Sequence, residues 1–167
     1  MPVPKTTLVA SLTAFVLLAL APGERSLAVA SERSAAVEAA VADEAPDLAV
    51  RLSGFRSDDG KVMVALFRGS DGFPTNPDKA FRSAITKIRG KRASVDFADL
   101  PPGEYAVSVI HDENDNDKLD TNFLGIPKEG IGTSNNAKAR FGPPKFRDAK
   151  FTVRDADVTQ RITMAYL

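Results

Sequence analysis

Apolar and polar residues alternate with a period of two over most of the chain. In the first such segment Leu48, Val50 and Leu52 share one face, which predicts a half-buried β-strand. Residues 61–67 are apolar on both faces and therefore predict a central strand. The turn sequence 58–60, Asp-Asp-Gly, lies between the two segments, so they are expected to pair as a hairpin.

Further segments with strand-like patterns follow at short spacing, separated by turn residues such as Pro101-Pro102-Gly103. These segments are 84–88, 93–97, 104–111, 150–153 and 158–166. No long helical pattern is evident after the first part of the chain. The spacing predicts an all-β fold, an antiparallel β-sandwich of about seven strands.

Residues 112–148 show neither the strand period nor the helix period and are rich in Gly, Pro and Asn. A structureless segment of this length is unusual inside a compact domain, and such loops are usually functional or held by their own side chains. Phe123, Leu124 and Ile126 are among its apolar residues, so part of the segment is expected to be buried. The sequence therefore predicts one long, compact loop with a short strand or a turn of helix.

Alternating oxygen-bearing side chains open this loop. Asp112, Asn114 and Asn116 occupy every second position, and Lys118 and Asp120 continue the spacing. In helix–loop–helix calcium sites, the first, third and fifth positions bind through side chains, the seventh through its carbonyl and the ninth often through water. The spacing predicts a calcium site made of these five residues, with Lys118 supplying its backbone carbonyl.

Two positions depart from that calcium pattern. Asp117 stands where the pattern has Gly, and Phe123 stands where it has a bidentate Glu. A closing ligand is therefore expected from elsewhere, either Glu129 or the pair Asn135 and Asn136. The alternative is a metal-free turn, because Asp and Asn side chains also bind loop backbone without an ion.

His111 is the only histidine, and it lies at the end of a strand segment beside the acidic run. A general base needs a nucleophile and an orienting acid within hydrogen-bond reach. The chain has no cysteine and contains neither a G-x-S-x-G nor an H-E-x-x-H motif. His111 is therefore interpreted as a hydrogen-bonding residue at the core edge. A hydrolase would need it to converge with Asp112 or Asp120 in a cleft.

Residues 134–146 form a second candidate site. Ser134-Asn135-Asn136 and the segment Phe141-Gly142-Pro143-Pro144 together offer amide groups and rings suited to a small molecule or a glycan. The alternative is that these residues make turns and anchor the long loop.

The N-terminal segment has the features of a secretory signal peptide. A single lysine precedes an apolar run over residues 8–21, which is short for a membrane-spanning helix. Ala28-Val29-Ala30 is a small-residue cleavage site, so residues 1–30 are expected to be removed and the protein to be periplasmic or secreted. An uncleaved membrane anchor is the alternative. Residues 31–46 are predicted to be a flexible linker and residues 47–167 the β-sandwich domain.

The charge of the chain is balanced, with 22 basic and 22 acidic residues. Cleavage after Ala30 leaves 20 basic against 21 acidic residues. This balance gives no electrostatic reason to expect nucleic acid or an anionic membrane as a partner, and no membrane insertion of the mature chain is expected. Because there is no cysteine, the fold depends on core burial without disulfides.

The run 111–127, H-D-E-N-D-N-D-K-L-D-T-N-F-L-G-I-P, resembles a bacterial exported family, domain of unknown function family 2141. The segments 134–137 (S-N-N-A), 141–144 (F-G-P-P) and 99–107 (D-L-P-P-G-E-Y-A-V) are also similar to it. The resemblance covers roughly residues 47–167 and implies export and a β-sandwich. The L-P-P-G-x-Y turn is similar to transthyretin-like (prealbumin-like) and carboxypeptidase-regulatory-like sandwiches, which implies an accessory domain without catalytic function.

The family tends to have Gly where this chain has Asp117, so the metal loop departs from the family at that position. The sequence as a whole predicts an exported, non-enzymatic binding or structural module, stabilised by calcium through the loop 112–120. The alternative is a small-molecule or glycan-binding domain that uses the loop 134–146. A hydrolase is the third hypothesis.

Overall fold

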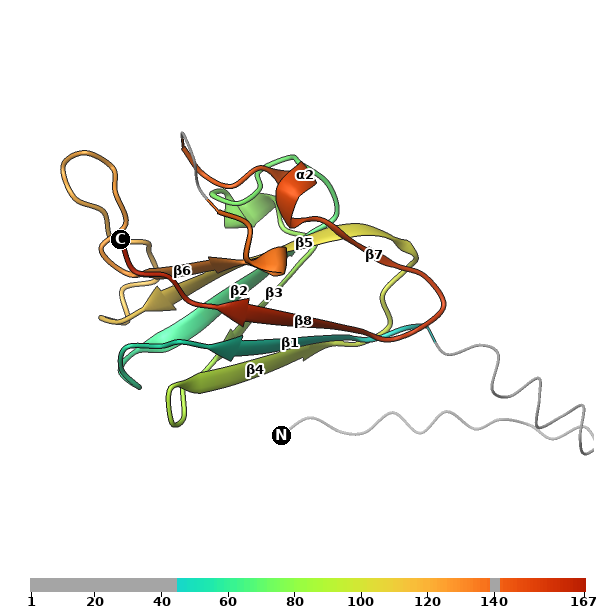
Figure 1. Cartoon of the computed structure of the whole chain (residues 1–167), viewed down its shortest axis with the longest axis horizontal. Coiled ribbons are helices and arrows are strands. Elements are labelled where there is room, and N and C mark those ends of the chain that lie inside the picture. The colour runs from blue at the N-terminus through green and yellow to red at the C-terminus, as the bar shows by residue number, and fades with distance from the viewer. Residues whose placement is uncertain (1–44, 139–141) are drawn as a thin grey trace, which may run out of the picture. The chain divides into compact units, whose positions relative to one another are not determined.

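The computed structural model describes residues 45–138 and 142–167, and this part of the chain is all-β (Figure 1). Eight strands form two sheets, with almost no helix. The strands are β1 (Leu48–Ser53), β2 (Lys61–Phe67), β3 (Arg82–Thr86), β4 (Arg92–Phe97), β5 (Gly103–Asp112), β6 (Gly130–Thr133), β7 (Phe151–Val153) and β8 (Val158–Thr163). The short helices are η1 (Pro77–Lys79), η2 (Ser134–Asn136) and α2 (Phe146–Ala149). The expected signal peptide and most of the expected linker lie outside the described residues.

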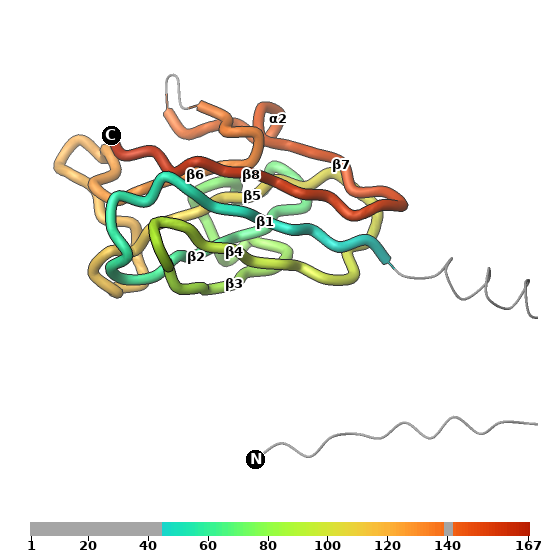
Figure 2. The backbone as a smooth tube through the Cα atoms, turned by 60° about the horizontal axis from the view of Figure 1, so that its bottom comes forward, coloured from blue at the N-terminus to red at the C-terminus, as the bar shows by residue number. Residues whose placement is uncertain are grey.

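The two sheets face each other as the layers of a sandwich (Figures 1 and 2). One sheet has the order β4-β1-β8, and the other has the order β3-β2-β5-β6, with β7 paired to the first residues of β5. Figure 2 shows β1 running beside β8 and β4 along its length. The expected all-β, sandwich-like architecture is therefore confirmed.

The expected hairpin between the first two strands is wrong. β1 pairs with β4 and β8, whereas β2 pairs with β3 and β5 in the other sheet. Each strand buries one face, with Leu48 and Val50 on β1 and Val62 and Val64 on β2 in the core. Because these two faces meet across the same core, the turn around Gly60 carries the chain from one sheet to the other.

One strand pair departs from the expected antiparallel arrangement. β1 and β8 are parallel, with Leu48 opposite Val158 and Leu52 opposite Ile162. The turn before β8 brings it into the sheet at the end where β1 begins, and the Val158 N–H donates to the Asp47 carbonyl at 2.9 Å. The three-stranded sheet is therefore mixed, while the other strand pairs are antiparallel.

β6 lies inside the segment expected to be one long loop, and it brings the strand count to eight rather than about seven. It pairs with β5, with Gly130 opposite His111. Packing requires glycine at two positions of β6. A Cβ on Gly130 would lie 2.7 Å from the Tyr166 ring, and a Cβ on Gly132 would lie 2.8 Å from the Ile162 side chain. Since glycine has no side chain, the strand period is not visible here. The expected short strand and turn of helix are present as β6, η2 and α2.

The core lies between the two sheets and is built from alternate residues of the strands. Tyr105 is among its fully buried side chains, and its hydroxyl donates to the Pro101 carbonyl at 2.6 Å. This bond ties the turn before β5 to the core, as a conserved tyrosine does in other β-sandwiches.

In residues 45–138 and 142–167, no helix has both the length and the apolar character that crossing a membrane requires.

Candidate functional site

β5 ends in the two residues that open the acidic run, His111 and Asp112, and both side chains are fully buried. The Asp112 carboxylate closes the following turn. Its Oδ1 accepts from the Asn116 N–H at 3.1 Å, and its Oδ2 accepts from the Asp117 N–H at 2.9 Å. The first predicted metal ligand therefore binds the backbone of its own loop.

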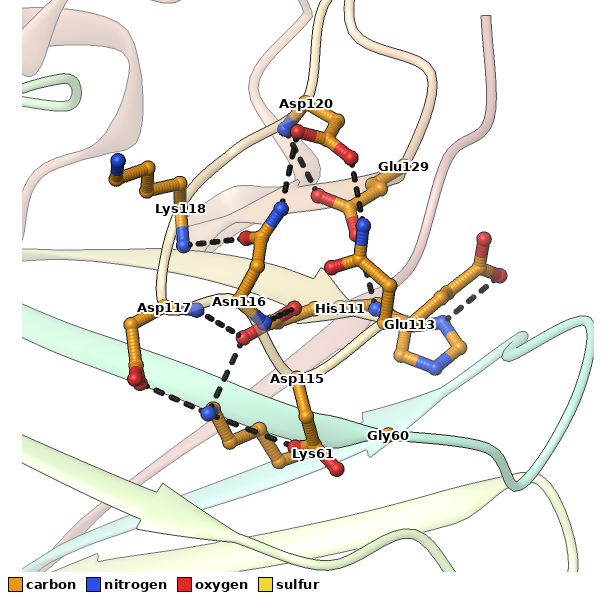
Figure 3. A network of polar contacts seen from close by, with 12 residues as sticks. Gly60, Lys61, His111, Glu113, Asp115, Asn116, Asp117, Lys118, Asp120 and Glu129 are labelled. Atoms are coloured by element: carbon orange, nitrogen blue, oxygen red, sulfur yellow. Dashed lines mark hydrogen bonds and ion pairs between the residues drawn. The ribbon is translucent and has the colours of Figure 1, made fainter.

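Lys61 approaches the acidic run from one side, and its ammonium contacts three of the carboxylates (Figure 3). It begins β2 and is opposite Asp112 in the pairing of β2 with β5. Its ammonium is 2.8 Å from Asp117 Oδ1, 3.3 Å from Asp112 Oδ2 and 3.5 Å from Asp115 Oδ1. A lysine therefore supplies positive charge where the sequence predicted a divalent ion. Sequence reasoning missed Lys61 because only long-range strand pairing brings it to the loop.

The ionisation of this cluster follows from its contacts. Burial alone would raise the pKa of Asp112, but the N–H groups of Asp117 and Asn116 and the Lys61 ammonium outweigh burial and lower that pKa. Conversely, the hydrogen bond to Asp117, supported by Asp112, raises the pKa of Lys61 against the opposing effect of burial. Both groups are therefore charged at neutral pH.

The other predicted ligands form a separate group around Asp120. The side-chain amides of Asn114 and Asn116 donate to the two oxygens of Asp120 at 2.8 Å and 3.1 Å. The Lys118 N–H donates to Asn116 Oδ1 at 2.9 Å. The five predicted ligands therefore do not converge on one point, because Asp112 faces Lys61 while the two amides face Asp120.

Across residues 45–138 and 142–167, no three His, Asp or Glu side chains are grouped so that they could hold a metal ion. The calcium site stays a prediction.

Glu129, a predicted closing ligand, lies at the base of the loop and is almost fully buried. Its two oxygens accept from the N–H groups of Glu113 and Asp120, each at 2.9 Å. Because those residues lie near opposite ends of the acidic run, one carboxylate holds the run closed. The other suggested closing ligands, Asn135 and Asn136, bind elsewhere, as described below.

His111 is held by contacts to both ring nitrogens. Its Nε2 lies 2.9 Å from the Asp59 carbonyl, which can only accept, so Nε2 carries the hydrogen. Its Nδ1 lies 2.8 Å from the Tyr166 hydroxyl, which itself accepts from the Arg56 N–H at 3.1 Å. Glu113 Oε1 is 3.5 Å from Nδ1 and pairs with the Arg56 guanidinium. These contacts fit a hydrogen-bonding residue that joins β5 to the C-terminal segment.

The far end of the loop, residues 121–127, exposes apolar side chains. Phe123 is 95% exposed, Leu124 67% and Ile126 41%. Part of the segment 112–148 is buried, as expected, with Glu129 and Ser134 among its buried residues. These three apolar side chains are not, because the turn is closed by its own backbone and by Asn122. Asn122 Oδ1 accepts from the N–H groups of Leu124 and Ile126 at 2.9 Å and 3.0 Å.

The second candidate site, residues 134–146, uses its polar groups internally. Ser134 is fully buried, and its Oγ accepts from the Val107 N–H at 2.9 Å and donates to the Ala149 carbonyl at 2.7 Å. The Asn135 amide donates to the same carbonyl, and Asn136 Oδ1 accepts from the N–H of a β8 residue at 2.8 Å. These groups connect η2 to β5, α2 and β8. Phe141 lies outside the described residues.

The comparisons with known proteins give one match. The sequence model of a family described as an uncharacterized protein conserved in bacteria (DUF2141) matches residues 50–161, which is more than half of the chain. No curated protein and no solved structure matches the chain.

Proposed function

The chain belongs to the bacterial family DUF2141, and we propose that this member is an exported, non-catalytic β-sandwich module that binds a protein partner through the tip of its β5–β6 loop. The tip is defined here as residues 121–127. One observation carries the proposal: three apolar side chains of the tip are exposed, although the loop that presents them is tightly held. An exposed apolar group on an ordered support is typical of an interaction site.

Three sets of contacts hold the loop that carries the tip. Lys61 and Asp112 hold the start of the loop, and Glu129 joins its two ends. Asn122 fixes the conformation of the tip through two backbone hydrogen bonds. Because these residues are already placed, binding would order few additional groups, which favours affinity.

The charge around the tip defines the chemistry of the partner. Residues 112–129 contain six acidic and two basic side chains. Lys61 and Arg56 pair with four of the acidic ones, so a smaller negative charge remains around the tip. An anionic membrane surface would repel this loop, whereas an apolar pocket with a cationic rim would complement it. Burying the exposed Phe123 side chain also requires a pocket in the partner, so we infer a protein with such a pocket.

Several observations support a non-catalytic role. Both nitrogens of the buried His111 are engaged by the chain itself. Ser134 and its neighbouring asparagines bind the backbone of β5, α2 and β8, which disfavours a small-molecule or glycan site at residues 134–146. Export is proposed from the signal-like residues 1–30, which places the partner in the periplasm or outside the cell.

We also propose that the sandwich is transthyretin-like. The turn 99–107 and the bond from the Tyr105 hydroxyl to Pro101 support this assignment. An experimental structure with a different strand order from the one seen here would contradict it.

The binding proposal is tested by cross-linking in the producing cells. A photoreactive phenylalanine analogue is placed at position 123, and a control analogue at position 152, an exposed position on β7. We expect a protein adduct from position 123 alone. The partner is then identified and purified, and its affinity for the wild type and for Phe123→Ser is measured by calorimetry.

The expected result is at least a tenfold loss of affinity for Phe123→Ser with an unchanged melting temperature. Equal affinity for both proteins, adducts with lipid only, or no adduct specific to position 123 would overturn the proposal.

A further inference from the structure

A basic groove is lined by residues of the three-stranded sheet and of the turn between β3 and β4. Its volume is about 600 Å³. In the part of the chain that the structure describes, five cationic side chains and no acidic one line it. These side chains are Arg51, Lys87, Arg89, Arg92 and Arg161. The chain as a whole has equal numbers of basic and acidic residues, so this cluster of cationic side chains is not visible from the net charge.

Strand alternation gathers the arginines on the outer face of the sheet. Arg51 lies between the buried residues Val50 and Leu52, so its side chain points away from the core. Arg161 is opposite Arg51 in the pairing of β8 with β1. Arg92 on β4 is opposite Ser53, which lies two residues after Arg51 on the same face of β1. Like charges on adjacent strands repel and destabilise the sheet. A ligand anion would remove this repulsion.

The carboxylates of the protein neutralise only part of this charge. Asp96 lies 2.5 Å from the Arg51 guanidinium, and Asp115 lies 3.9 Å from Lys87. For Arg89, Arg92 and Arg161, no carboxylate of the described residues lies within ion-pair distance. Three guanidinium groups are therefore available to a ligand.

We propose that this groove binds a ligand with two or more phosphate groups. Guanidinium groups bind phosphate oxygens through paired hydrogen bonds, and several of them around one concave surface fit a ligand with several phosphates. The hydroxyls of Ser53, Thr86 and Ser94 also line the groove and are suitable donors to phosphate oxygens.

Single-stranded nucleic acid is disfavoured as the ligand, because the groove has no aromatic residue on which a base could stack. A soluble polyphosphate and a phosphorylated lipid headgroup share the required chemistry. The proposal is independent of the partner-binding tip, since no residue of the tip lines the groove.

The experiment uses the purified protein and sodium tripolyphosphate as the probe, measured by calorimetry at low ionic strength. The test variant is the double substitution Arg92→Gln with Arg161→Gln, and the matched control is Arg154→Gln, an exposed arginine outside the groove. All three positions are exposed, so the variants are expected to fold, which a melting curve checks. We expect the double variant to bind at least tenfold more weakly and the control to stay within twofold of the wild type.

A vesicle arm separates the two sources of phosphate. Vesicles of phosphatidylcholine with cardiolipin, whose headgroup carries two phosphates, are compared with phosphatidylcholine alone by sedimentation. Binding to the anionic vesicles that the double variant loses indicates a lipid headgroup, and binding to tripolyphosphate alone indicates a soluble ligand.

Failure to bind tripolyphosphate, or an equal loss of affinity in the Arg154→Gln control, would overturn the proposal. Tighter binding to a duplex oligonucleotide than to either phosphate probe would also overturn it, because the site would then be a nucleic-acid surface.

Discussion

The ammonium nitrogen of Lys61 lies 3.3 Å from Oδ2 of Asp112, a carboxylate with no exposed surface. The two residues are opposite each other on the antiparallel strands β2 and β5. Asp112 also accepts two backbone N–H groups from the loop that follows it. This pair therefore links the sheet to the conformation of the acidic run, and several consequences can be measured.

Replacing Lys61 by methionine is expected to lower the melting temperature. The substitution keeps a long apolar side chain but leaves the buried Asp112 without its cation, which is more costly than losing an exposed pair. The matched control is Lys87→Met, because Lys87 is more exposed and its ammonium contacts no buried carboxylate: it lies 3.9 Å from Asp115 and donates to the Gly60 carbonyl at 3.1 Å. Calorimetry of both variants should give the larger decrease for Lys61→Met, and equal decreases would show that the Lys61 contacts do not stabilise the fold.

The lowered pKa of Asp112 predicts a loss of stability in acid. Because the folded pKa lies below the unfolded value of about 3.9, the stabilisation is complete above that value and is lost as the pH falls through the folded pKa. Asp112→Asn should be less stable than the wild type at pH 7, and its melting temperature should fall less between pH 5 and pH 2. Asp155→Asn, at an exposed position, serves as the control and should follow the wild type. Parallel curves for Asp112→Asn and the wild type would assign the acid sensitivity to other carboxylates.

Calcium is expected to have little effect on the melting temperature. The Lys61 ammonium already occupies the position between Asp112, Asp115 and Asp117, and the amides of Asn114 and Asn116 donate to Asp120. Melting curves with millimolar calcium and with a chelator should therefore coincide. A rise with calcium that the chelator removes would instead confirm the calcium site predicted from the sequence.

The sequence was sufficient for the fold class but not for the strand partners. Alternation shows which face of a strand is buried, as for Leu48 and Val62, but it does not show which sheet the strand joins. The two strands therefore looked like a hairpin, although they lie on opposite sides of the core. β6 was hidden for a different reason, because its glycines carry no side chains from which a period could be recognised.

The candidate site was predictable where it depends on local spacing. Residues 112–120 follow one another as a turn, as expected. The ammonium that contacts three of their carboxylates belongs to Lys61, which long-range pairing of β2 with β5 brings to this turn. The exposure of Phe123 was not predictable either, because an apolar residue in a loop is normally expected to be buried. The hydrogen bonds of the Asn122 side chain and of the tip backbone explain how the tip keeps its conformation without joining the core.

Gly60 should not tolerate a side chain. Its φ is +67°, and a Cβ there would lie 2.0 Å from the Asp112 carbonyl oxygen and 2.8 Å from Glu113 Cα. Gly60→Ala is expected to destabilise the domain by roughly 2–4 kcal/mol, from steric overlap and the left-handed conformation together. Gly90 has a φ of +57° with no atom within 4 Å of its Cβ position, so Gly90→Ala isolates the conformational cost of roughly 1–2 kcal/mol. Denaturant unfolding measures both, and equal losses would mean that the chain relaxes around Gly60 without cost.

Ser134→Ala tests whether the second candidate site is structural. Its hydroxyl accepts from the Val107 N–H and donates to the Ala149 carbonyl, and both hydrogen bonds are buried. Alanine would leave the Val107 N–H of a central strand without a partner, so a loss of roughly 1–3 kcal/mol is expected in denaturant unfolding. Ser83→Ala, at an exposed position of β3, should change stability by less than about 0.5 kcal/mol. If Ser134→Ala were as neutral as Ser83→Ala, its hydroxyl would be free for another role, and the ligand site at residues 134–146 would regain support.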